Sequence, residues 1–243
     1  SRFKKYEILV PNGTWNECDW GNFGEFVSIK GQDRYLTIIN CDGTDTNVNH
    51  VVPGDYIGSG AYAGQQFATV PKDWRHLVFM VSDLNVSNMT FRAKSCKYVA
   101  HIDSDTKFKN VLFENISIEE NDCNTPIGIG VWGGQNIMFK YCSIKRALPG
   151  GLGVLFHNWN DQPEDSKTEF YRCKFKNCGY VDVQELGSQK NDYLILNSCK
   201  TDFVDTSRYI VSSSSAYVPK TSTPYSIHVV VINTPGFIID SYA

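Results

Sequence analysis

The segment FHNWND, residues 156–161, contains the densest group of side chains that could do acid/base chemistry. His157 lies in this segment, and Asp182 and Glu185 follow in the segment YVDVQEL. A carboxylate beside an imidazole raises the histidine pKa and orients the ring, which suits general acid/base catalysis. We therefore take His157, Asp182 and Glu185 as candidate catalytic residues. The alternative is that His157 makes only a structural hydrogen bond.

Aromatic and polar side chains near these residues suit sugar rings. The apolar faces of a sugar stack on flat aromatic rings, and its hydroxyls both donate and accept hydrogen bonds. The candidate glycan-binding residues are Trp132, Trp159, His101, Asp103, Asn158 and Gln184. The alternative is that the tryptophans pack under loops or against a neighbouring subunit.

A repeat of alternating apolar residues predicts the elements that position these groups. The shared position is occupied by Phe91, Phe113, Phe139, Phe170 and Leu196, at spacings of 22, 26, 31 and 26 residues. Each unit reads as a strand of period two, and a second strand such as IGIGVW or GVLFHNW follows it. Constant strands with variable loops predict a parallel β-solenoid, in which equivalent side chains stack about 4.8 Å apart on successive turns, or rungs.

Cysteines recur at a fixed place in this repeat. Cys142, Cys173 and Cys199 stand three residues after the shared position, so we expect an inward ladder of small apolar thiols. The eight cysteines form no C-x-x-C motif, so a zinc site has no support, and a chain of this length does not need disulfides. We expect no metal and no cofactor.

The second strands of the repeat predict an outer face. The residues expected to point inward are Ile129, Val131, Val154, Phe156, Val181 and Val183. Asp103 and Asp182 are expected three rungs, or about 14 Å, apart, which is too far for a glycosidase pair. Asp182 could pair instead with Glu185 or with a loop acid, namely Asp161, Glu164 or Asp165. Alternatively, those loop acids form a solvated turn.

Several segments resemble a known superfamily. EILVPNGTWNE and GEFVSIKGQDRYLTIINCDGT resemble the N-terminal rungs of the pectin lyase-like superfamily. The units FENISI, GVLFHN and FYRCKF are similar to right-handed β-helices of phage tail spikes and appendages of the pectate-lyase type. The resemblance covers most of residues 5–211.

The resemblance implies an all-β, right-handed parallel β-helix that engages a cell-surface polysaccharide such as capsule or teichoic acid. It also implies a homotrimer on a virion tail or another extracellular surface. Because this fold hosts lyases, hydrolases, esterases, epimerases and binders, three functions stay open: a polysaccharide depolymerase, a glycan-binding module and a structural spacer.

We expect one domain over residues 1–243. It divides into N-terminal rungs (1–41), a loop insertion (42–75), regular rungs (76–211) and a linker with a β-rich C-terminal cap (212–243). The insertion would form either the rim of a binding site or a plain surface loop. The β-forming tail would either cap the solenoid or pair with another subunit.

Composition and charge argue against two other classes of protein. The net charge is −3 and no long basic run occurs, which argues against nucleic-acid binding. No stretch approaches 18 consecutive apolar residues, so we expect no membrane-spanning helix. The opening SRFKKYEILV has neither an initiator methionine nor a signal peptide, so we expect an excised domain or a processed product.

Overall fold

A computed structural model provides the structure of the chain. The residues it describes are 5–16, 27–42, 76–78, 83–96, 98–102, 110–123, 125–131, 136–149, 151–158, 165–184, 192–202, 211–213 and 227–235. Within these ranges every regular element is a β-strand, and every strand pairing is parallel. The prediction of an all-β, parallel architecture is therefore confirmed.

The strands belong to three sheets. The first sheet contains β1 (Tyr6–Val10), β3 (Val27–Gly31), β6 (Leu84–Ser87), β9 (Val111–Glu114), β12 (Asn136–Lys140), β15 (Ser166–Tyr171), β18 (Asp192–Asn197) and β21 (Ile227–Ile232). The second contains β2 (Gly13–Asn16), β4 (Thr37–Asp42), β7 (Thr90–Lys94), β10 (Ser117–Asn121), β13 (Ser143–Arg146), β16 (Lys174–Lys176) and β19 (Lys200–Thr201). The third contains β5 (His76–Val78), β8 (Tyr98–Ile102), β11 (Thr125–Val131), β14 (Gly151–Asn158), β17 (Cys178–Gln184) and β20 (Val211–Ser213).

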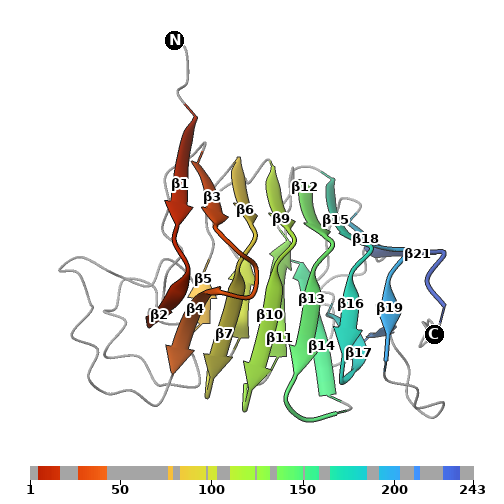
Figure 1. The fold of residues 1–243 in the computed structure, drawn as a ribbon. Coiled ribbons are helices and arrows are strands. Elements are labelled where there is room, and N and C mark those ends of the chain that lie inside the picture. The colour runs from red at the N-terminus through yellow and green to blue at the C-terminus, as the bar shows by residue number, and fades with distance from the viewer. Residues whose placement is uncertain are drawn as a thin grey trace, which may run out of the picture.

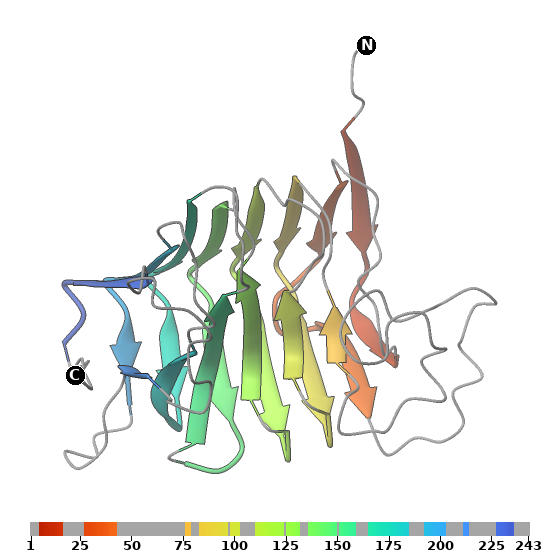
Figure 2. The same ribbon diagram turned by 180° about the vertical axis from the view of Figure 1, so that it is seen from behind.

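The chain visits the sheets in a fixed order. From β6 to β20 each strand of the first sheet is followed by one of the second and then one of the third. Successive strands of a sheet lie side by side, so the stack runs from the red N-terminal end to the blue C-terminal end in Figures 1 and 2. This arrangement is consistent with a β-helix-like solenoid.

Aromatic side chains stack along the inner side of the first sheet. Phe113, Phe139 and Phe170 are fully buried, with ring centroids 4.9 Å and 4.7 Å apart, and Leu196 follows opposite Phe170. This part of the predicted ladder is confirmed. Equivalent phenylalanines on adjacent parallel strands stack face to face because the strand spacing is close to the preferred ring separation.

The first member of the predicted ladder is wrong. Phe91 lies on the second sheet, where it pairs with Ile118, and the residue opposite Phe113 is Val86. The true spacing at this step is therefore 27 residues, in line with the following 26. The apparent match arose because each repeat unit is two short strands joined by a tight turn, and not the single strand that we predicted.

The turn between the first and second sheets has a constant geometry. One residue with positive φ precedes a buried residue, as Asn115 (φ 56°) precedes Ile116 and Arg172 (φ 51°) precedes Cys173. The positive-φ residues at this turn are Asn88, Asn115, Tyr141, Arg172, Ser198 and Asn233. Asparagine tolerates this left-handed conformation better than other non-glycine residues, and three of the six positions carry it.

The buried turn positions contain the predicted cysteine ladder. Cys142, Cys173 and Cys199 are at most 1% exposed, and each thiol donates to a carbonyl of the preceding rung, at 3.4, 3.3 and 3.2 Å. In the last described rung Thr234 takes this place, and its hydroxyl lies 3.1 Å from the Leu196 carbonyl oxygen. The inward ladder is confirmed.

One cysteine differs from expectation. Cys41 is disulfide-bonded, whereas Cys123, Cys142, Cys173, Cys178 and Cys199 are buried free thiols. A core of this size does not require a covalent link, but the sequence pattern could not exclude one.

The described part of the C-terminal tail extends the first sheet. β21 pairs in parallel with β18, from Asp192 opposite Ile227 to Asn197 opposite Ile232. The described part of the chain contains no apolar helix of the length that a membrane span requires.

Candidate functional site

The third sheet brings several of the predicted site residues into adjacent rows. One row contains His101, Gly128, Leu155 and Asp182, each opposite the next on neighbouring strands. Val154 and Phe156, which flank Leu155, are fully buried, whereas Leu155 is half-buried. The row therefore has the parity of the outer face of the sheet.

The next row of the same parity contains Gly130, His157 and Gln184. His157 stands directly opposite Gln184, and Asp182 stands opposite Leu155, two residues earlier. The Cα atoms of His157 and Asp182 are then diagonal neighbours, about 8 Å apart from the strand spacing and rise. Asn158 stands opposite Val131, in a row of the same parity as the buried Phe156.

The other predicted site residues lie outside the described part of the chain. They are Trp132, Trp159, Asp103, Glu185, Asp161 and Glu164, together with residues 43–75 of the predicted insertion. Their proposed roles stay predictions. Asp165 is described; it is exposed and immediately precedes β15.

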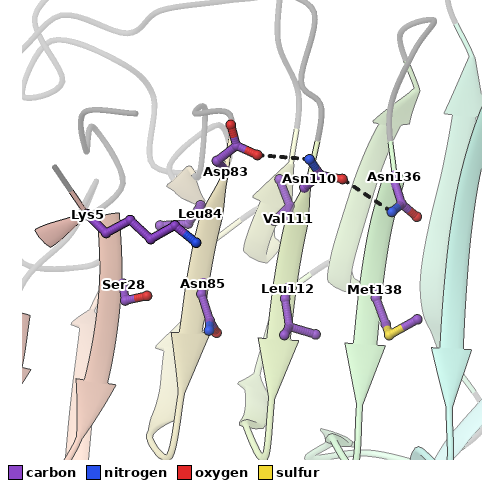
Figure 3. Close-up of a pocket in the computed structure, with 10 residues that line it drawn as sticks. All are labelled: Lys5, Ser28, Asp83, Leu84, Asn85, Asn110, Val111, Leu112, Asn136 and Met138. Carbon is purple, nitrogen blue, oxygen red and sulfur yellow. Dashed lines mark hydrogen bonds between the residues drawn. The ribbon is translucent and has the colours of Figure 1, made fainter. Parts of the chain in front are cut away.

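A groove over the first sheet is a second candidate site. It has a volume of about 550 Å³ and crosses β3, β6, β9 and β12 (Figure 3). Its lining residues are Lys5, Ser28, Asp83, Leu84, Asn85, Asn110, Val111, Leu112, Asn136 and Met138. This volume falls in the range of small-molecule sites.

A ladder of side-chain hydrogen bonds forms one edge of the groove. Asn110 Nδ2 donates to Asp83 Oδ1 at 2.9 Å, and Asn136 Nδ2 donates to Asn110 Oδ1 at 3.4 Å. Figure 3 shows the three side chains in a line, one from each of three adjacent strand ends. Because Asp83 accepts at the head of the ladder, it orients both amides.

The floor of the groove is mixed in polarity. Ser28, Asn85, Leu112 and Met138 are opposite one another on four adjacent strands, and all four are half-buried. Lys5 reaches over the floor toward Asn85 from the N-terminal end (Figure 3). The lining thus has one carboxylate and one ammonium group around an uncharged floor.

An ion pair follows next to the groove. Glu169, opposite Met138, is 9% exposed, lies 2.8 Å from Lys167 Nζ and accepts from Asn197 at 3.2 Å. Burial is the largest single influence and raises the pKa of Glu169, but the hydrogen bonds from Lys167 and Asn197 together outweigh it and leave the pKa below its usual value. Glu169 is therefore ionised at neutral pH, and the neighbouring Lys167 compensates its charge.

The sequence contained a signal for this groove that we did not use. Asp83, Asn110 and Asn136 each stand three residues before Val86, Phe113 and Phe139, the true members of the ladder, at spacings of 27 and 26. Polar residues repeating in phase with a buried ladder indicate stacked side chains. The misplacement of the first repeat at Phe91 concealed this match.

Among the described residues, no group of three His, Cys, Asp or Glu side chains could hold a metal ion. Comparison with known proteins finds no matching family model, no matching curated protein and no matching solved structure. The chemistry of the two faces therefore carries the functional argument.

Proposed function

We propose that this protein recognises a cell-surface polysaccharide on the outer face of its third sheet, and that its three sheets form a right-handed parallel β-helix. Crossover connections between parallel strands of one sheet are right-handed in nearly all proteins, which supports this handedness. The resemblance to the pectin lyase-like superfamily supports the same fold and the polysaccharide class. The setting that we propose is a homotrimeric tail spike or appendage of a phage, exposed outside the cell.

The observation that carries the proposal is the register of the third sheet. It gathers His101, Asp182, His157 and Gln184 into two adjacent rows, which also contain Gly128 and Gly130. Imidazole, carboxylate and amide groups in adjacent rows, with tryptophans expected nearby, suit a chain of sugar hydroxyls.

Depolymerisation is the catalytic form of this proposal. His157 would transfer a proton, with Asp182 orienting its ring from the diagonal position and Glu185 as a further acid. Non-catalytic recognition is the second candidate. It is favoured by the register, which sets the neutral Gln184 directly opposite His157 and the acidic Asp182 only at a diagonal position.

The test is a time course of the whole chain against purified capsule and teichoic acid polymers, with polymer size and reducing ends as readouts. His157→Ala and Trp132→Ala are compared with Lys174→Ala, an exposed position on the second sheet. Shortened polymer that His157→Ala abolishes supports the depolymerase. Retention of intact polymer that Trp132→Ala abolishes supports recognition alone. Polymer cleaved or retained equally by all variants would contradict the third-sheet site.

A further inference from the structure

We propose that the groove over the first sheet is a separate saccharide-binding site, which takes a neutral sugar chain lying across the strands. It lies on a different sheet from His157 and Asp182, so this inference does not rest on the proposed function. Four features of the groove support it: its extent, its amide ladder, its floor and its charge.

The extent of the groove suits a short segment of a chain of linked sugars. It crosses four adjacent strands of the first sheet, each about 4.8 Å from the next. From β6 to β12, a polymer laid across the strands therefore meets one ladder residue and one floor residue at each strand. Parallel stacking produces this periodic surface without any dedicated loop.

The amide ladder has hydrogen-bonding capacity to spare. Each amide nitrogen has two hydrogens and each amide oxygen two lone pairs. Asn110 uses one hydrogen on Asp83 and accepts one from Asn136, so both amides retain donors and acceptors at the exposed edge. Hydroxyl groups match this edge because they also donate and accept.

The floor contributes apolar contact and one unmet acceptor. Leu112 and Met138 present half-buried apolar surface on adjacent strands, against which the C–H face of a sugar ring can pack. Beside them the side-chain oxygen of Asn85 is buried and has no hydrogen-bond partner among the described residues. A buried acceptor of this kind costs free energy until a donor reaches it.

Charge argues for a neutral ligand. The lining has a single acid, Asp83, and a single base, Lys5, and the neighbouring Lys167–Glu169 pair is internally compensated. A polyanion such as polyuronate would meet Asp83 along the ladder without a row of cations to compensate it. Neutral hexoses and N-acetylated hexosamines carry no such penalty.

The test is titration calorimetry of the whole chain with hexagalacturonate and with four neutral hexasaccharides. The neutral hexasaccharides are hexamers of β1,4-linked glucose, α1,4-linked glucose, mannose and N-acetylglucosamine. We expect at least one to bind, and Asn110→Ala and Leu112→Asp each to weaken it tenfold or more. Asn40→Ala is the matched control, because Asn40 donates to Asn16 in an equivalent amide pair on the second sheet at 2.9 Å. A melting curve for each variant separates loss of the site from loss of the fold.

Three results would overturn the proposal: binding of none of the four hexasaccharides, preference for hexagalacturonate over all of them, or equal affinity in Asn110→Ala and the wild type. The variant His157→Ala distinguishes binding in this groove from binding on the third sheet. If His157→Ala abolishes hexasaccharide binding while Asn110→Ala retains it, the ligand lies on the third sheet and the groove is not its site.

Discussion

Burial holds the thiols of Cys173 and Cys178 in the protonated form. Burial is the largest cause that raises the pKa of Cys173 well above its ordinary value, and it raises the pKa of Cys178 from near 9 to about 12. Removing water disfavours the charged thiolate, which lacks a compensating cation of equal strength. These thiols therefore act as small apolar side chains with a weak donor.

Cys178 should make the stability of the protein fall at alkaline pH. The pKa of Cys178 is higher in the folded protein than in the unfolded chain. Its contribution to the free energy of unfolding is therefore fully present below pH 9 and is lost as pH rises toward 12. By linkage the loss reaches about 2 kcal/mol at pH 10.5. Urea unfolding at pH 7.5, 9 and 10.5 should show the wild type losing more stability than Cys178→Ser. An equal loss in both proteins would mean that Cys178 does not titrate in this range.

The guanidinium group of Arg34 should stabilise the protein by joining the turns of two successive rungs. Its Nη1 donates to Asn115 Oδ1 at 2.9 Å and to the Tyr141 carbonyl at 3.2 Å, and its Nη2 donates to the Ile116 carbonyl at 2.8 Å. Arg34→Met removes all three charged hydrogen bonds and should destabilise the protein by about 2 kcal/mol. Arg34→Lys should recover less than half of this, because a single ammonium cannot reproduce the guanidinium fork.

Urea unfolding measures both Arg34 variants, with Lys30→Met as the control. Lys30 is exposed on β3, the strand that leads into the Arg34 turn, and its removal should change the free energy of unfolding by less than about 0.5 kcal/mol. A similar loss of unfolding free energy in Arg34→Met and Lys30→Met would contradict this role of Arg34.

The positions of the strands could be predicted from the sequence, but their register could be predicted only in part. The alternation around Phe139 and Phe170 indicated strands correctly, because buried phenylalanines recur at constant places. The similar strings NMTF and NVLF misled the alignment at Phe91, because Asn88 is a turn residue whereas Asn110 precedes a strand. Positive φ, which distinguishes the two asparagines, is a property of the backbone and not of the residue type.

The same limit applied to the candidate sites. Polar residues on the second strands drew attention to the third sheet, and the register places His157 and Asp182 close there. The groove over the first sheet was missed because its polar residues lie in separate repeats, and only stacking joins Asp83, Asn110 and Asn136 into a ladder. A site made of one residue from each repeat has no local motif.

Stability should vary along the stack, because each rung contacts only its neighbours. Strands in the middle of the first sheet have a partner on both sides, and their inward residues Phe139 and Phe170 are fully buried. β1 is the end strand of that sheet, and its residues Tyr6, Ile8 and Leu9 are 61%, 43% and 68% exposed. Little apolar burial therefore holds β1 to β3, and the end of the stack should open without unfolding the middle.

Amide hydrogen exchange should resolve this gradient along the chain. Local opening free energies follow the burial and hydrogen bonding that opening disrupts, so peptides covering β12 and β15 should show opening free energies at least about 2 kcal/mol above those covering β1. Mass spectrometry at neutral pH on the whole chain measures both. β2 and β13 provide a parallel comparison on the second sheet, where the exposed Trp15 contrasts with the buried Ile144. Equal protection of β1 and β12 would mean that the stack unfolds as one cooperative unit, against the nearest-neighbour behaviour that its topology predicts.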